Sequence, residues 1–192
     1  MEPGKMKVAK INITLSGLAD IMFDKFVGQG PDPGIPEQKL YMVENNQVVL
    51  PSENIYAFLL SENPAGCAKA FEGKKGKEYI RMGQGHLTVS PDMIPFTQDN
   101  KQVVFKEFGE TFYVSQYAPR VKSGSLSIKQ NIRLRPVLRL PWELSFQITL
   151  FDNKLIDDNR LHNWFDRGGI EIALGTYRPR FGRFMVKEFK TE

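Results

Sequence analysis

An unbroken alternation of apolar and polar residues runs from Trp142 to Leu150, and it restricts the possible folds more than any other feature of the sequence. The apolar positions are Trp142, Leu144, Phe146, Ile148 and Leu150, and the polar positions between them are Glu143, Ser145, Gln147 and Thr149. Successive side chains of a β-strand point to opposite faces of a sheet, so this pattern predicts a strand with one face buried. The fold must therefore be built around a half-buried strand in the last third of the chain.

A helix is predicted after this strand. Asp157 is placed to cap its N-terminus, and Ile156 and Leu161 have the spacing of a hydrophobic staple around that cap. The helix is expected to end at Gly168-Gly169, because glycine takes the left-handed conformation without a steric cost. The remaining predicted elements are a short strand over Ile170 to Leu174, a loop over Gly175 to Gly182 and a closing strand over Phe184 to Phe189.

The first half of the chain yields a similar set of elements. A strand is predicted over Lys10 to Ser16 from its alternation, and a helix is predicted to begin at Ser52 after Pro51. Further predicted elements are a hairpin around Asn45-Asn46, a helical stretch over Cys67 to Phe71, and a β-rich region from about Tyr79 to Tyr117 with strands at His86 to Val89, Val103 to Phe108 and Thr111 to Val114. A loop with the glycines and prolines of residues 28–36 separates the first strand from the hairpin.

The order of these elements is strand, helix, strands, strand, helix, strand. That order predicts an α+β fold of the ferredoxin-like or RRM-like β-α-β-β-α-β kind, with insertions at about residues 28–50 and 73–140. A length of 192 residues fits a single domain over residues 1–192.

Composition excludes several classes of protein. Cys67 is the one cysteine and His86 and His162 are the two histidines, so neither a disulfide framework within the chain nor a cysteine-based zinc cluster is available. We expect no metal and no cofactor. The sequence has no apolar run near the roughly 20 residues of a membrane span, and the first ten residues lack the apolar stretch of a signal peptide. A cytoplasmic location is the expectation.

Charge is distributed unevenly along the chain. The net charge is +4 overall, and the segment from Thr111 to Trp142 holds no acidic residue. Its cations are Arg120, Lys122, Lys129, Arg133, Arg135 and Arg139. A stretch of this kind suits a polyanionic partner, and the alternative is a solvated loop of a basic protein.

The loop before the closing strand carries residues suited to nucleic acid. Gly175 and Gly182 permit close backbone approach, Arg178, Arg180 and Arg183 match phosphate geometry, and Tyr177 and Phe181 offer rings for stacking on bases. The alternative is a strand-to-strand turn that needs glycine geometry and pairs its arginines with nearby acids.

A helix ending in Gly-Gly, a short strand, the run Gly175-Thr176-Tyr177-Arg178-Pro179-Arg180-Phe181-Gly182-Arg183-Phe184 and a final strand together resemble the C-terminal signature of the RAMP (repeat-associated mysterious protein) superfamily. This superfamily contains the RNA-recognition-motif-like subunits and guide-processing ribonucleases of CRISPR systems. The resemblance is firmest over Arg133 to Lys187. The pattern also resembles small proteins encoded by phages and prophages. The chain departs from the superfamily in having fewer glycines in this loop, at Ala173 and Arg183, and in being shorter than most CRISPR backbone subunits.

The resemblance implies an RNA-binding role, and a long basic β-hairpin that projects from the sheet to contact nucleic acid or a neighbouring subunit. The hairpin falls on Arg120 to Arg139, with Lys122, Lys129, Arg133 and Arg135 as its phosphate contacts. We therefore predict a non-enzymatic protein that binds single-stranded nucleic acid, RNA before DNA. The resemblance also allows an oligomer or a subunit of a larger complex.

Two alternatives stay open. The first is a metal-independent endoribonuclease with His86, in the run Gly83-Gln84-Gly85-His86, as its general base. The second is a structural or interaction protein of a phage or mobile element that keeps the fold without binding nucleic acid. The lysine-rich run from Gly73 to Lys77 lacks the ending of a phosphate-binding Walker loop.

Overall fold

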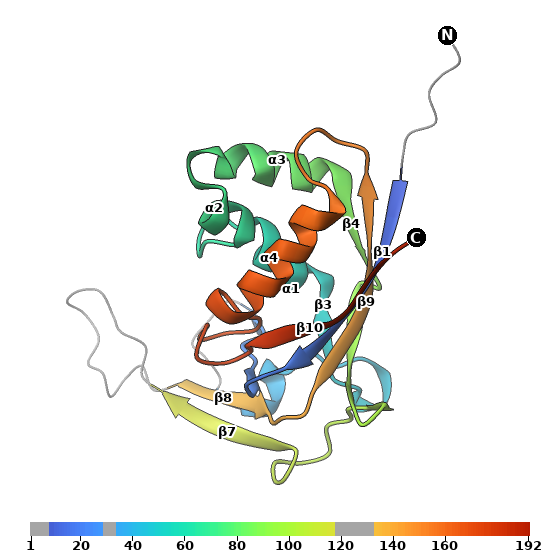
Figure 1. Ribbon diagram of the computed structural model, residues 1–192. Helices are drawn as coiled ribbons and strands as arrows, with labels where there is room; N and C mark the ends of the chain where they lie inside the picture. The colour runs from blue at the N-terminus through green and yellow to red at the C-terminus, as the bar shows by residue number, and fades with distance from the viewer. Residues whose placement is uncertain (1–7, 29–33, 118–132) are drawn as a thin grey trace, which may run out of the picture.

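The computed structural model describes residues 8–28, 34–117 and 133–192, and its main element is an antiparallel sheet (Figure 1). Strand β1 (Val8–Gly17) lies between β10 (Phe184–Thr191) and β9 (Glu143–Phe151). On its other side β9 pairs with β4 (Leu87–Ser90) along one part of its length and with β5 (Met93–Gln98) along another. Two short strands complete this edge by pairing with β5, namely β3 (Val49–Pro51) and β6 (Lys101–Gln102).

The alternation that predicted the central strand is confirmed by β9. Leu144, Phe146, Ile148 and Leu150 are buried, while Ser145 between them is exposed. Ile13 lies opposite Phe146 in the ladder between β1 and β9, so the apolar residues of the two strands share one face.

The helices lie together on this apolar face of the sheet (Figure 1). Three helices come between β3 and β4 in the sequence: α1 (Ser52–Leu60), α2 (Cys67–Phe71) and α3 (Gly76–His86). The fourth, α4 (Asp158–Glu171), connects β9 to β10. Short 3-10 turns occupy Pro36–Lys39, Glu44–Asn46 and Gly73–Lys75.

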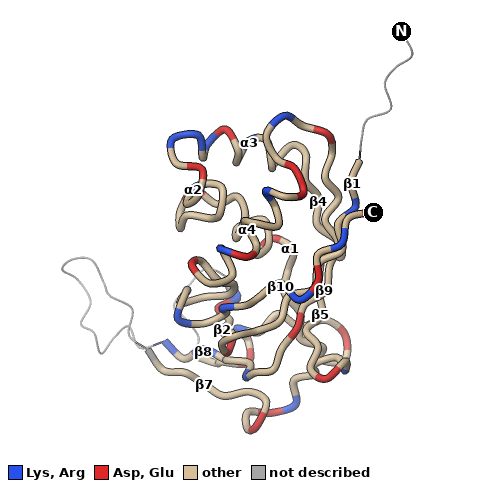
Figure 2. The backbone as a smooth tube through the Cα atoms, viewed as in Figure 1, with Lys and Arg blue, Asp and Glu red and all other residues tan. Residues whose placement is uncertain are grey.

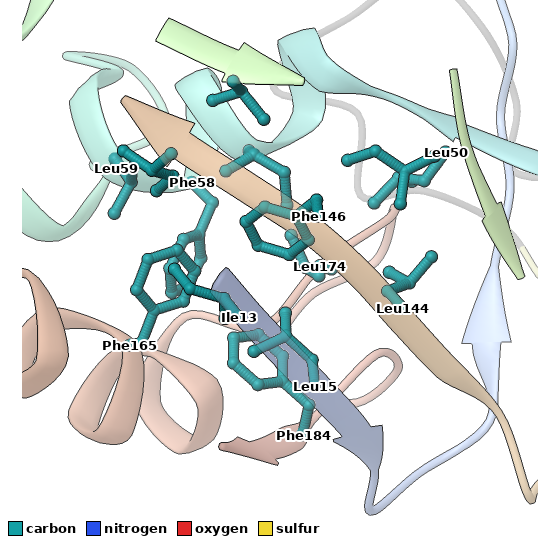
Figure 3. Close-up of a cluster of buried hydrophobic side chains, with 14 of the residues drawn as sticks. Ile13, Leu15, Leu50, Phe58, Leu59, Leu144, Phe146, Phe165, Leu174 and Phe184 are labelled. Carbon is teal, nitrogen blue, oxygen red and sulfur yellow. The ribbon is translucent and has the colours of Figure 1, made fainter. Parts of the chain in front are cut away.

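Aromatic side chains join the helices to the sheet (Figure 3). The ring of Phe58 in α1 has its centroid 5.4 Å from that of Phe165 in α4 and 5.4 Å from that of Phe184 in β10. Phe165 in turn lies 6.0 Å from Phe146 of β9. All four are buried, and burial of such large apolar side chains is the dominant favourable term in folding.

A second, smaller sheet includes the last part of the segment in which the hairpin arm was predicted. Strand β7 (Phe112–Tyr117) pairs with β8 (Arg133–Leu138) over their full lengths, and β8 also pairs with β2 (Ile21–Met22). Of the arm predicted over Arg120 to Arg139, the structure places Arg133–Leu138 in β8, while residues 118–132 lie outside the described residues.

The fold is α+β with antiparallel sheets, as predicted. Strands β10, β1, β9 and β4 follow one another across the sheet, and helices precede both β4 and β10 in the sequence. This arrangement is compatible with the predicted ferredoxin-like plan, to which β3, β5, β6 and the second sheet are additions. Among the described residues, no helix is long and apolar enough to cross a membrane.

The prediction of β-structure from Tyr79 onward is wrong for its first residues. Tyr79 to His86 belong to α3, and β4 begins only at Leu87. Glycine is a weak helix former, but a Cβ atom at Gly83 would lie 2.5 Å from Leu60 Cδ2. Gly83 is therefore a close packing point between α3 and α1, and this tertiary contact outweighs the low helix propensity of glycine.

The predicted end of α4 at Gly168-Gly169 and the predicted strand after it are also wrong. The helix continues to Glu171, and both glycines lie buried inside it. A Cβ atom at Gly168 would lie 2.5 Å from Phe58 Cζ, so glycine allows the helix to approach the core closely. The left-handed residue that ends the helix is Ala173, with φ of 66°.

Two further predictions, a strand over Val103 to Phe108 and a turn at Asn45-Asn46, have different outcomes. Residues 103–108 form no strand apart from one isolated bridge between Val104 and Gln47. The predicted turn at Asn45-Asn46 is present, because both residues have positive φ and the Val43 N–H donates to the Gln47 carbonyl at 3.0 Å. Asparagine tolerates this conformation better than other non-glycine residues.

Candidate nucleic-acid interface

The C-terminal loop, residues 173–183, connects α4 to β10 and requires glycine at two positions. Gly175 and Gly182 both have φ of 74°. A Cβ atom at Gly175 would lie 2.6 Å from the Met22 carbonyl oxygen, and one at Gly182 would collide with the Leu174 carbonyl oxygen. Both glycines therefore allow a close approach between backbone segments of this chain.

Backbone hydrogen bonds hold the loop against residues 18–22, which follow β1. The Gly182 N–H donates to the Asp20 carbonyl at 2.8 Å, and the Thr176 N–H donates to the Met22 carbonyl at 3.0 Å. The Leu18 N–H donates to the Arg183 carbonyl at 2.8 Å. Contacts from both ends of the loop thus fix its path, so its side chains project from a rigid support.

Three side chains of the loop form a patch of rings and positive charge. Tyr177 is 43% exposed and has a left-handed backbone with φ of 56°. Its ring centroid lies 6.2 Å from that of Phe181, and the Arg180 guanidinium carbon lies 5.8 Å from the Phe181 centroid. Two rings beside an exposed guanidinium are the kind of group on which nucleic-acid bases can stack.

The other two arginines of the loop differ in exposure. Arg183 is exposed, and it makes no ion pair with any described residue. Arg178 is half-buried, and its Nη1 donates to the Ala173 carbonyl at 3.3 Å. Loss of water around the Arg178 guanidinium lowers its pKa from the ordinary value. Arg178 also lines a surface hollow of about 360 Å³ together with Pro64, Glu171 and Tyr177.

Asp20 joins this loop to the hairpin of β7 and β8. Its backbone carbonyl accepts from Gly182, while its carboxylate accepts from the Tyr113 hydroxyl at 3.1 Å and from the Leu140 N–H at 3.0 Å. Burial and the nearby Asp20 carboxylate raise the pKa of Tyr113. We call this set of contacts the Asp20 joint.

The Asp20 joint brings Arg139 to the same surface as the loop. The Arg139 guanidinium carbon lies 4.3 Å from the centre of the Tyr113 ring. The positive charges of Arg139 and Arg180 favour the ionised Tyr113 hydroxyl and so oppose the rise in its pKa. The sequence placed Arg139 in the acid-free segment, but nothing in its pattern separated this residue from the other cations there.

Arg135 does not lie on this surface, which corrects its predicted role as a phosphate contact. Its side chain is 0% exposed, and its Nε lies 2.8 Å from Asp24 Oδ1. Arg133 is 45% exposed, and its Nη1 lies 3.9 Å from Asp24 Oδ2. The Asp24 carboxylate therefore pairs with two cations that were predicted to be phosphate contacts of the arm, and Lys39 lies 3.7 Å from the same carboxylate. Arg120, Lys122 and Lys129 lie outside the described residues.

His86 is the last residue of α3 rather than the start of a strand. Its Nδ1 lies 3.1 Å from the Met82 carbonyl oxygen, one turn back in the same helix. His162 stacks on Phe189 and lies 3.6 Å from Asp166 on the exposed side of α4. In the described parts of the chain, no group of three or more His, Cys, Asp or Glu side chains could hold a metal ion.

The sheet face opposite the helices lacks aromatic side chains at the centre of β1 and β9. Its polar groups bond to one another instead: Gln147 Nε2 donates to Asn12 Oδ1 at 3.0 Å, and the hydroxyls of Thr14 and Ser145 are 3.1 Å apart. RNA-recognition motifs stack bases on aromatic residues of the sheet. The C-terminal loop, in contrast, carries the exposed ring of Tyr177 beside the half-buried ring of Phe181.

Comparison with known proteins relates the chain to others by its fold. No family model matches the sequence, and no curated protein matches it. Among solved structures, the fold is similar to a chain of the type III-B Cmr-beta complex bound to cognate target RNA, determined by cryo-EM. The TM-score is 0.58 at 12% sequence identity, over 96% of this chain and 61% of the Cmr-beta chain. The present chain thus spans about three fifths of its neighbour's length. The likeness shows a shared fold and does not bear on a phage origin.

Proposed function

We propose that this chain is a RAMP-like, non-enzymatic subunit that binds single-stranded nucleic acid, RNA in particular. The observation that carries the proposal is the joint surface of the C-terminal loop and the hairpin. Tyr177, Phe181 and Arg180 come from the loop and Arg139 from the hairpin, and the Asp20 joint holds the two segments together.

The chemistry of this surface suits a single strand. Exposed guanidinium groups bind phosphate oxygens with directed hydrogen bonds, and exposed rings stack on unpaired bases. Base pairs in a duplex have no free faces for such stacking. The likeness to a chain of an RNA-bound complex supports RNA over DNA, and it supports a place in a multisubunit assembly.

Fluorescence anisotropy tests the proposal with labelled single-stranded RNA, single-stranded DNA and duplex DNA at about 50 and 200 mM salt. The Arg180→Ala/Arg183→Ala variant removes two exposed cations of the loop. The Lys10→Ala/Lys190→Ala variant is the control, because it removes two exposed cations from β1 and β10 that form no ion pair with any described residue.

We expect tight, salt-sensitive binding to single-stranded RNA. Each phosphate contact on a single strand contributes about 0.7 to the salt slope, so the double loop variant lowers the slope by about 1.4. The control leaves it unchanged. An equal loss in both variants would refute the site. Failure of the wild-type chain to bind any of the three probes would favour the protein-interaction role.

The same samples test the ribonuclease alternative. RNA incubated with the wild-type chain without added metal should stay intact. Cleavage that disappears in the His86→Ala variant would assign the chain to the metal-independent ribonucleases and refute the non-enzymatic proposal.

A further inference from the structure

A second group of cations lies at the opposite end of the helical layer from the C-terminal loop. Lys74, Lys75, Lys77 and Arg81 surround a surface hollow where the 3-10 turn leads into α3. All four are exposed, and none forms an ion pair with another described residue. Figure 2 shows the positive charges gathered along this turn. We call this group the α3 cluster.

The α3 cluster is not explained by the stability of the helix. Three of its members lie just before or within the first turn of α3. The partial positive charge of a helix N-terminus disfavours cations there by about 0.3–1 kcal/mol each. Glu78 is the one acidic residue in the first turn. An excess of unpaired cations at this end, beside a hollow, is suited to a polyanion.

A neutral seam between α2 and α4 connects the α3 cluster to the C-terminal loop. Near the cluster, Arg160 Nη1 lies 2.7 Å from Glu72 Oε2. Further along α4, the Arg167 guanidinium carbon lies 4.1 Å from the Phe71 ring centre, and its Nε lies 3.3 Å from Glu171 Oε1. Each of these two arginines is paired with an acid, so the seam is not counted as a third cationic surface.

The length of α4 sets the distance between the two cationic surfaces. Its N-terminal half is tied to Glu72, just before the α3 cluster, and its C-terminus leads directly into the loop. From Arg160, which contacts Glu72, to the end of the helix at Glu171, a rise of 1.5 Å per residue gives about 16 Å. At about 3.4 Å per nucleotide, the rise along one strand of a duplex, about five nucleotides separate the two surfaces.

We propose that the α3 cluster is a second phosphate-binding surface, and that a bound single strand runs from the C-terminal loop along the seam of α2 and α4 to reach it. This inference rests on the proposed function of the loop. A strand of about 15 nucleotides contacts both surfaces, whereas a strand of about four nucleotides contacts the loop alone; both lengths lie in the usual range of single-strand sites.

The test compares these two RNA lengths by fluorescence anisotropy over a salt series. The variant Lys74→Ala/Lys77→Ala/Arg81→Ala removes three exposed cations of the cluster. Its matched control, Lys10→Ala/Lys106→Ala/Lys190→Ala, removes three exposed and unpaired cations among the described residues outside the proposed path. With the longer RNA, the cluster variant should lower the salt slope by about 2, since each lost contact is worth about 0.7. With the short RNA its slope should match the wild type.

The outcomes separate this inference from the proposed function. If the loop variant weakens binding but the cluster variant leaves the longer RNA unaffected, the second surface is refuted and the loop site stands. An equal loss with the short RNA, or an equal loss in the control, would also refute it, because the effect would then arise from the field of the whole protein. If the wild-type chain binds neither RNA, both proposals fail.

Discussion

The Asp20 joint makes a testable claim about how the candidate interface is held together. Asp20→Ala removes the carboxylate that accepts from the Tyr113 hydroxyl at 3.1 Å and from the Leu140 N–H at 3.0 Å. The backbone bond from Gly182 to the Asp20 carbonyl stays in place, because it does not use the side chain. The substitution therefore loosens the hairpin from residues 18–22 without removing a cation.

The loss of unfolding free energy in Asp20→Ala follows from the two hydrogen bonds that the substitution removes. A half-buried hydroxyl bonded to a carboxylate contributes about 1.5 kcal/mol, the lower end for bonds to charged groups. Leu140 is exposed, so water replaces its partner, and that bond contributes about 0.5 kcal/mol. The variant should lose about 2 kcal/mol of unfolding free energy. With an m-value of about 2 kcal/mol/M, the urea midpoint falls by about 1 M.

Urea unfolding followed by tryptophan fluorescence measures this loss, because Trp142 Nε1 donates to the neighbouring Ala19 carbonyl at 2.8 Å and reports on the joint directly. Tyr113→Phe alone should cost about 1.5 kcal/mol, and the double variant should cost no more than Asp20→Ala alone. Strictly additive costs in this double-mutant cycle would show that the two side chains do not interact, and the joint would have no basis.

Three further predictions concern single residues. Gly182→Ala places a Cβ atom against a backbone carbonyl at positive φ and should lower the melting temperature by several degrees in a thermal scan, about 2–4 °C for each kcal/mol lost. Gly85→Ala, at a helical position with open space around it, should raise the free energy of unfolding by about 0.5–1 kcal/mol. Gly168→Ala should lower the free energy of unfolding by about 1–3 kcal/mol, because the added Cβ atom presses on Phe58. Urea midpoints in the opposite order would contradict the packing described for α4. Burial and a neighbouring carboxylate raise the pKa of Tyr113, so stability from its neutral hydroxyl is present below the unfolded pKa of about 10 and disappears as pH rises through the higher folded pKa. Tyr113→Phe should flatten the alkaline part of a stability–pH curve, and an unchanged curve would exclude this hydroxyl.

Patterns with a strict period predicted the fold well. The alternation of β9 and the cap at Asp157, whose carboxylate accepts from the Arg160 N–H at 2.8 Å, are both present. Glycine was the main source of error in the predicted helix boundaries. A glycine that ends a helix and a glycine inside a helix that allows close packing cannot be told apart in the sequence. Gly168-Gly169 and Gly83 are of the second kind, and only the positions of Phe58, Phe184 and Leu60 distinguish them.

The sequence singled out the loop residues of the candidate site, but not Arg139 or the way the loop and Arg139 are brought together. The loop motif identified Tyr177, Arg180 and Phe181 as a group, and they lie together. Their connection to Arg139 depends on Asp20, which lies more than a hundred residues away in the sequence and belongs to no motif. A long-range contact of this kind leaves no periodic signal, so sequence reasoning could not have found it.

The number of charged residues in a segment of the sequence does not say where positive charge lies on the protein surface. Residues 116–192 carry the excess of cations, yet Arg135 there is buried against Asp24. The first 115 residues carry a net negative charge, yet they contain the α3 cluster, whose four cations are exposed and unpaired among the described residues. A phosphate group is attracted by cations that are exposed and unpaired, wherever they lie in the sequence, and not by the overall composition of a segment. The proposed path of a bound strand therefore rests on where exposed cations without an acidic partner gather around one surface hollow, as Lys74, Lys75, Lys77 and Arg81 do, and not on isolated cations such as Lys10 or Lys106.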